Sequence, residues 1–171
     1  AAFTAAFGEE DVWDIALGPD RTVAVAARGG LFLRDATGWR RVFPHDATRS
    51  WAPRDVRAVL FDASGRLWFG SPQGVGRREG EAWTLYEGKD GLPDNRFTAM
   101  AAAGDGALWF GTDRGAFRFE DGERPEWRYR QGRRWLPDDV VRDLFVGPRN
   151  DAWFATAAGV GRIAFRDTTL G

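Results

Sequence analysis

An internal repeat is the feature that most constrains what this chain can fold into. Three segments share one pattern of Gly, Trp and apolar residues: GRLWFGSPQGVGR (65–77), GALWFGTDRGAFR (106–118) and NDAWFATAAGVGR (150–162). RTVAVAARGGLFL (21–33) is a weaker first copy, with Ala24 where the others carry Trp. Equivalent glycines recur at intervals of 44, 41 and 44 residues: Gly30, Gly74, Gly115 and Gly159. Such a period indicates one supersecondary unit stacked several times.

Each unit reads as four short strands. A strand such as VRAVLF (56–61) is followed by a tight turn of Gly, Pro, Asp or Asn, and then by a strand that carries the Trp. A turn ending in Gly leads to the third strand, and the fourth carries another Trp, as in WTLYE (83–87). We predict an all-β fold, a β-propeller with four blades of four antiparallel strands visible in this chain. The predicted blade repeats are 11–43, 56–87, 97–130 and 141–165.

The ends of the chain raise the question of ring closure. After GVGRIAF only RDTTLG remains, so the fourth unit lacks a clear outer strand. The segment AFTAAF (2–7) resembles WTLYE, with Phe3 in the place of the Trp. We expect residues 2–7 to be the closing strand of the last blade, which would leave no free sheet edge. Residues 1–171 then form a single propeller domain as a closed small ring, or a segment of a larger ring, completed by a longer chain or by a second copy.

The third unit also resembles a known family. GLPDNRFTAMAAAGDGALWFGTDRGAFRFEDG (91–122) is similar to the two-component regulator propeller repeat, whose pattern runs GLP-x-N, an apolar strand, D-x-x-G-x-LW-x-GT and GL-x-R. The second unit has APRD before its first strand, the fourth has LPDD and AWFAT, and the first has lost the Trp. The resemblance implies an extracytoplasmic sensor domain of a bacterial signalling protein, or a binding domain of another secreted protein. Neighbouring families include propeller lyases that depend on His.

Composition narrows the chemistry. The 171 residues contain no Cys, which excludes disulfides, thiol catalysis and Cys-ligated zinc. His45 is the only histidine, so a His-rich metal site is excluded and any Ser-His-Asp triad would depend on it. We predict no enzyme activity, no cofactor and no metal. The net charge of −1 makes nucleic acid an unfavoured partner, although WRYRQGRRW (127–135) combines Arg with aromatic residues.

Two observations bear on localisation. The chain has no apolar run long enough for membrane insertion. Its Ala-rich start without Met is typical of a mature end left by signal-peptide cleavage. We expect a periplasmic or secreted bacterial protein, with possible partners in further domains or in other copies of the chain.

The repeated Trp and Arg positions are predicted to be scaffold. Trp68, Trp109 and Trp153 should pack between neighbouring blades. Arg77, Arg118 and Arg162 recur on the third strands and are expected to form ion pairs between blades.

The candidate binding residues lie on the loops that join the fourth strand of one blade to the first of the next, and on the turns between second and third strands. In a propeller these share one face, beside the channel, and long loops on a rigid scaffold commonly carry function. The long loops are 44–55, 88–95 and 131–139. The candidates are Trp51, Arg54, Asp55, Asn95, Arg96, Arg114, Trp135, Asp138, Arg28 and Gln73.

Several interpretations of these residues remain open. Trp offers a flat surface to a sugar or aromatic group, and Arg offers a fork to carboxylates. Trp51 and Trp135 could instead be lids on the blade below, and Asn95 and Asp139 could satisfy turn backbones. The Arg side chains, Arg133 and Arg134 included, could also be consumed in ion pairs with nearby Asp.

Two classes of function follow. The first is a non-catalytic sensor or recognition propeller that binds a small polar or acidic ligand or a protein partner through the long-loop face. The alternative is a structural assembly module that supports a larger complex or an adjoining domain. A propeller lyase or hydrolase is the less favoured third reading.

Overall fold

The computed structural model describes residues 2–122 and 124–164. In this part of the chain the strands form four consecutive antiparallel sheets. The first contains β1 (Val12–Leu17), β2 (Val23–Ala27), β3 (Gly30–Asp35) and β4 (Gly38–Val42). The second contains β5 (Ala58–Phe61), β6 (Leu67–Ser71), β7 (Gly74–Glu79) and β8 (Ala82–Tyr86). The third contains β9 (Phe97–Ala102), β10 (Leu108–Thr112), β11 (Gly115–Glu120) and β12 (Glu126–Arg130). The fourth contains β13 (Val141–Val146), β14 (Ala152–Thr156) and β15 (Gly159–Ile163).

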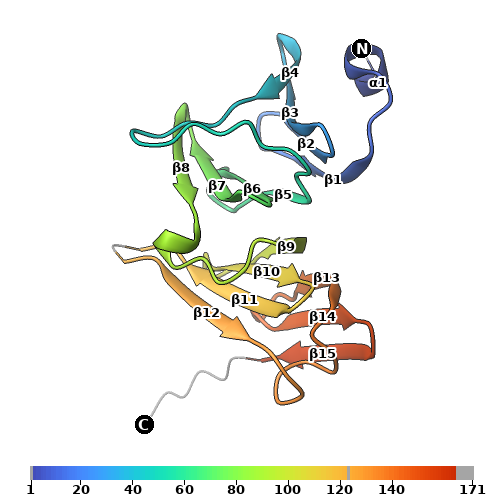
Figure 1. Ribbon diagram of the computed structural model, residues 1–171, viewed down its shortest axis with the longest axis vertical. Helices are drawn as coiled ribbons and strands as arrows, with labels where there is room; N and C mark the ends of the chain where they lie inside the picture. The colour runs from blue at the N-terminus through green and yellow to red at the C-terminus, as the bar shows by residue number, and fades with distance from the viewer. Residues whose placement is uncertain (1, 123, 165–171) are drawn as a thin grey trace.

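Each sheet is a meander in which every strand pairs with the next along the chain. The first strands β1, β5, β9 and β13 lie next to one another in that order and form the inner side of the assembly. Figure 1 shows the four sheets following each other from the blue end of the chain to the red end. The predicted all-β fold is confirmed: the sheets are four blades of a β-propeller. We refer to them as blades 1 to 4.

The recurring glycines have a physical reason. Gly30, Gly74, Gly115 and Gly159 all begin a third strand with φ between 126° and 144°, a region that other residues rarely adopt. At Gly74 an added Cβ would lie 2.1 Å from the carbonyl oxygen of Tyr86. The repeat therefore keeps glycine for its backbone conformation at all four positions, and at Gly74 also for close approach.

The core consists of the side chains that fill the spaces between neighbouring blades. Trp68 and Trp109 are completely buried, and their rings contact Phe119 and Phe154 in the next blade, with ring centroids 5.6 and 5.3 Å apart. The prediction that these two tryptophans pack between blades is confirmed. Trp153, at the same position of blade 4, is 40% exposed, because no further blade in the described residues covers it.

The ion pairs of the third-strand arginines agree with the prediction only in part. Arg77 pairs with Asp121 and so links blade 2 to blade 3. Arg118 pairs with Asp105 and Glu120, and Arg162 with Asp151, all inside their own blade. Among the described residues these ion pairs of Arg118 and Arg162 lie within one blade, so only the Arg77 pair is of the predicted kind.

The four blades form an open arc. The inner-strand contacts run from β1 to β5, from β5 to β9 and from β9 to β13. The outward-facing side of each end blade keeps large apolar residues exposed, with Leu17 at 71% on blade 1 and Val160 at 67% on blade 4. Figure 1 places blade 1 and blade 4 at opposite ends of the assembly.

The predicted closing strand is wrong. Residues within 2–7 form the helix α1 (Phe3–Phe7), which lies beside blade 1 and not beside blade 4 (Figure 1). Phe3 and Phe7, four residues apart, share one side of the helix and contact Phe32. The helix ends at Gly8, whose φ is 77°. Residue 1, residue 165 of the predicted fourth blade and residues 166–171 lie outside the described residues.

None of the helices among the described residues is long and apolar enough to cross a membrane.

Candidate functional site

A polar cavity lies where the loop between blades 2 and 3 meets two second-to-third-strand turns. The loop contains the short 3-10 helix η1 (Gly88–Asp90) and the segment 92–96. Gln73 comes from the β6–β7 turn and Arg114 from the β10–β11 turn. These elements together line a cavity of about 320 Å³. The long loop and the turns therefore share one face, as the sequence predicted, and we call this surface the loop face.

A second cavity adjoins the first. It has a volume of about 250 Å³ and shares Asn95 and Arg96 with the first cavity. Its other lining residues are Asp55, Arg57, Pro72, Phe97, Thr98 and Asp113. Five of the ten predicted candidates line the two cavities: Asp55, Gln73, Asn95, Arg96 and Arg114.

Arg96 is the centre of the charged groups on this face. Its guanidinium donates to Asp94 at 2.8 Å and lies 3.2 Å from a carboxylate oxygen of Asp113. Burial acts to raise the pKa of Asp94, but hydrogen bonds from Arg96 outweigh it and the pKa is lowered. The hydrogen bond to Asp94 also raises the pKa of Arg96. Both groups are therefore charged at neutral pH, and most of the charge of Arg96 is already balanced.

Arg114 differs from Arg96. Its side chain is exposed, and its guanidinium forms no ion pair with any residue that the structure describes. The turn that carries it is held in place, because Tyr129 donates its hydroxyl to the carbonyl oxygen of Arg114 and Thr112 accepts from the Arg114 backbone amide. Arg114 is therefore an exposed cation on a turn whose backbone is held by hydrogen bonds.

The remaining cavity residues are anchored through their backbones or neighbours. The Asn95 amide donates to the carbonyl oxygen of Pro72, which ties the long loop to the β6–β7 turn. Asp55 has a φ of 51° and its backbone amide donates to the carbonyl oxygen of Arg28 at 2.7 Å. Its carboxylate pairs with Arg57 at 2.9 Å. These contacts connect the long loops to the neighbouring turns.

Trp51 is not on the surface. Its side chain is only 5% exposed, it contacts Phe69 edge to face, and its indole nitrogen donates to Glu87 at 3.2 Å. This corrects its prediction as an aromatic platform for a ligand: Trp51 is part of the core between blades 1 and 2.

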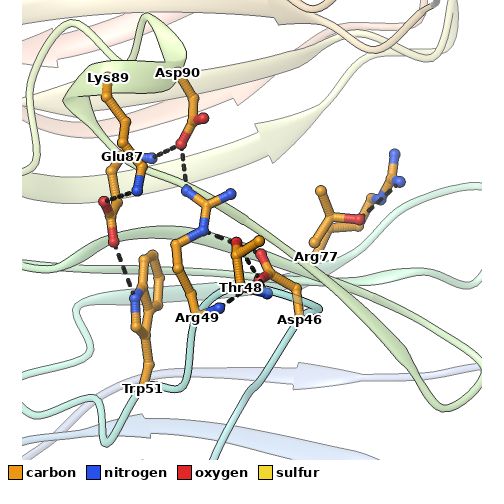
Figure 2. A network of polar contacts seen from close by, with 9 residues as sticks. Asp46, Thr48, Arg49, Trp51, Arg77, Glu87, Lys89 and Asp90 are labelled. Atoms are coloured by element: carbon orange, nitrogen blue, oxygen red, sulfur yellow. Dashed lines mark hydrogen bonds and ion pairs between the residues drawn. The ribbon is translucent and has the colours of Figure 1, made fainter.

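A polar network fixes the loop around Trp51 (Figure 2). Arg49 pairs with Asp46 at 3.1 Å and also with Asp90 of η1. Burial acts to raise the pKa of Asp46, yet hydrogen bonds from Thr48 and Arg49 lower it to about 2. Figure 2 shows Glu87 between Trp51 and Lys89, so the network joins the loop 44–55 to the loop after β8. Its role is to hold these two loops together.

The other four candidates do not line the two cavities. Trp135 is 36% exposed and lies under the guanidinium groups of Arg130 and Arg134. Asp138 accepts from the Val140 backbone amide, which is a turn role. Arg28 forms an exposed pair with Asp11, and Arg54 is exposed.

Sequence reasoning missed Asp94, Asp113 and Arg57. Asp94 was hidden inside the GLPDN turn pattern, although its spacing of two from Arg96 in an extended loop was the available signal. His45 is exposed and its backbone bridges to Ser50. Within the described residues no group of three or more His, Asp or Glu side chains is placed to hold a metal ion.

The loop between blades 2 and 3 is also where a family model matches. The family described as "Two component regulator propeller" matches residues 91–114, which run from Gly91 in the loop to the Arg114 turn. This segment of the third repeat is therefore similar to a two-component regulator propeller repeat. The resemblance inferred from the sequence is confirmed for this unit. A comparison with curated protein sequences finds no match.

Solved structures with the same fold include extracellular domains of two component systems. The extracellular domain of the hybrid two component system BT4673 from B. thetaiotaomicron is similar with a TM-score of 0.73 and 16% identity, covering 92% of this chain and 22% of that one. The corresponding domain of BT3049 gives 0.69 and 20%, covering 88% and 21%. Virginiamycin B lyase from Staphylococcus aureus, crystallised with quinupristin, gives 0.65 and 14%, covering 95% and 58%. The chain therefore spans about a fifth of the length of the first two, and these identities establish the fold alone.

Proposed function

We propose that this chain is a non-catalytic recognition propeller, part of an extracytoplasmic sensor, that binds a small polar ligand with one acidic group at the loop face. The observation that carries the proposal is the pair of adjoining cavities that share Asn95 and Arg96. The first of them also contains Arg114, which forms no ion pair with the residues that the structure describes. An acidic side chain of a protein partner has the same chemistry and is included in the proposal.

The charges of the two cavities favour one acidic group over a polyanion. The cationic residues are Arg57, Arg96 and Arg114, and the acidic ones are Asp55, Asp94 and Asp113. The formal charges cancel, and two of the three Arg are already paired with Asp. Arg114 therefore supplies the one available fork for a carboxylate. Gln73 and Asn95 supply amide groups beside it for hydroxyl or amide groups of a ligand.

The sensor part of the proposal rests on the family and on the neighbours. Residues 91–114 match the two-component regulator propeller family, and similar folds are extracellular domains of two-component systems. Those printed names support an extracytoplasmic location for this chain. The lyase and a gluconolactonase among the neighbours share the fold only, so no reaction is proposed from them.

Calorimetry of Arg114→Gln against the parent tests the proposal. The probes are a uronic acid monosaccharide, an end-blocked tripeptide with a single Asp, and the neutral counterpart of each. We expect an acidic probe to bind the parent, more weakly at high salt because exposed charges are screened over about 8 Å at physiological ionic strength. Arg114→Gln should abolish that preference. Arg149→Gln, an exposed Arg on the β13–β14 turn, is the matched control and should bind like the parent. Equal binding of acidic and neutral probes, or equal loss in both variants, would contradict the proposal.

The alternative function, an assembly module, has one observation in its favour. Blade 4 keeps Phe145, Trp153 and Val160 exposed on one face. None of these residues lines the two cavities of the loop face, so the two functions can be tested separately.

A further inference from the structure

The outward face of blade 4 is an apolar surface with a defined composition. Phe145 and Trp153 are cross-strand partners, and Val160 lies on the same side because it pairs with Ala155, two residues after Trp153. These side chains are 63%, 40% and 67% exposed. Together with Asp143, Leu144, Phe154 and Ala155 they line a shallow cavity of about 170 Å³. Single exposed apolar residues are ordinary, but a contiguous patch of this kind indicates an interaction surface.

The chain itself shows what covers this face elsewhere. In blade 2 the equivalent residues are Leu60, Trp68 and Val75, which are 8%, 0% and 0% exposed. They form one apolar cluster with Phe97, Leu108 and Phe119 of blade 3. In blade 3 the equivalent Trp109 lies against Phe154 of blade 4. In blades 2 and 3 the next blade therefore covers the equivalent surface.

A carboxylate on blade 4 repeats a contact that joins two blades. In β1, Asp14 accepts from the backbone amide of Ile15 at 2.8 Å, and its second oxygen accepts from the amide of Val59 in the next blade at 2.9 Å. Asp143 occupies the equivalent position of β13 and accepts from the amide of Leu144 at 2.9 Å. Its other oxygen has no donor among the residues that the structure describes. The missing donor corresponds to a backbone amide of an inner strand.

We propose that the outward face of blade 4, formed by Asp143, Phe145, Trp153 and Val160, is the docking surface for a further propeller blade. That blade packs on blade 4 in the same way as blade 3 packs on blade 2. Its inner strand runs beside β13 and donates a backbone amide to Asp143. Its leading face places apolar side chains on Trp153 and Val160. Aromatic burial and a hydrogen bond to a charged acceptor both favour this occupant.

The experiment supplies a blade from the chain's own sequence. The full chain is extended at its C-terminus by a second copy of residues 80–130, which contains an outer strand, the loop and blade 3. The residues that link the two parts should add little to the free-energy cost of docking, because loop-closure entropy grows slowly with length. We expect amide hydrogen exchange of β13 and β14 to slow by about tenfold or more relative to the unextended chain. Unchanged exchange in a folded extension would overturn the proposal.

Variants separate specific docking from general stabilisation. Trp153→Arg and Asp143→Ala should remove most of the slowing in the extended chain, and Asp143→Asn, which keeps an acceptor oxygen, should retain more of it than Asp143→Ala. Arg149→Gln, on the β13–β14 turn, should retain all of it. Equal slowing in Trp153→Arg would contradict docking at this face.

A second copy is the competing occupant. Sedimentation equilibrium of the unextended chain distinguishes the two. A monomer agrees with the proposal, whereas a dimer that Trp153→Arg dissociates would assign the face to a second copy and overturn it. Neither outcome depends on Arg114, so ligand binding at the loop face is tested separately.

Discussion

Blade 3 and blade 4 have nearly the same sequence motif and opposite environments. Trp109 in LWFGT is completely buried, whereas Trp153 in AWFAT is 40% exposed. On the adjacent strands the equivalent residues Ala116 and Val160 are 0% and 67% exposed. Both blades have the same hairpin register around their Trp, which pairs with Arg118 in one and Arg162 in the other. Local sequence thus determines the strands and their register, while burial is determined by the neighbouring blade.

The largest expected effect is at the buried member of this pair. Trp109→Ala should lower the free energy of unfolding by about 3–5 kcal/mol, because it removes a large aromatic side chain from a closely packed site. Trp153→Ala should lower it by only about 1–2 kcal/mol, because much of that ring is already in water. Denaturant unfolding of both variants measures the difference. Equal losses would mean that Trp153 is covered in solution and that the comparison fails.

The loop tryptophans extend the comparison to the loop face. Trp51 lies inside the arc between blades 1 and 2, and Trp135 precedes blade 4 and is 36% exposed. Trp51→Ala should cost about 3 kcal/mol, since it also leaves Glu87 without its indole donor. Trp135→Ala should cost less than half as much. Thermal unfolding with both variants checks this, and a larger loss for Trp135→Ala would reverse the division between interior and end.

The carboxylates that accept hydrogen bonds from the tryptophan indoles extend the comparison between blades to the pH dependence of stability. Asp62 accepts from the indole of Trp68 at 2.8 Å and from Arg66 at 2.7 Å. Burial acts to raise the pKa of Asp62, but these hydrogen bonds outweigh it and the pKa is lowered. A lowered pKa means that this stabilisation is present above the unfolded value near 3.8 and is lost as pH falls through the folded value.

Asp62→Asn should therefore lower the free energy of unfolding at neutral pH by about 1–3 kcal/mol. The gap between parent and variant should narrow below about pH 4, where the parent loses the same charge. Asp151→Asn is the counterpart at blade 4, where Asp151 accepts from Trp153 and Arg162. It should have the smaller effect at neutral pH, because its partners Trp153 and Arg162 are 40% and 43% exposed. A gap that is constant from pH 7 to pH 2 would contradict the assignment to Asp62.

Much of the fold was predictable from the sequence, because strands and turns are local. The Trp-bearing strands, the Gly positions and the shared face of loops and turns all follow from the repeat. The closing strand was not predictable in the same way. AFTAAF contains an apolar alternation that suits a strand, but it is also Ala-rich with Phe at a spacing of four, and its contact with Phe32 favours the helix.

The candidate site was harder to predict for a related reason. Asp55, Gln73, Asn95, Arg96 and Arg114 were selected because their loops share a face, which depends only on blade topology. Whether a loop side chain points outward depends on tertiary contacts that no repeat encodes. Trp51 is the example: its burial depends on Phe69 and on Glu87, which is 36 residues away.

The two ends of the arc give the smallest expected effect on stability and the sharpest test of how they differ. At the N-terminal end α1 covers part of blade 1, and the Phe7 ring lies 4.4 Å from that of Phe32. Both helix Phe side chains remain partly exposed, so Phe7→Ala should lower the free energy of unfolding by about 1 kcal/mol. Thr4→Ala, at an exposed position of the same helix, is the control and should lie within about 0.5 kcal/mol of the parent. A loss as large as that of Trp109→Ala would make α1 an integral part of the core. No loss at all would mean that α1 does not cover blade 1 in solution. Both ends of the arc would then expose an apolar sheet face.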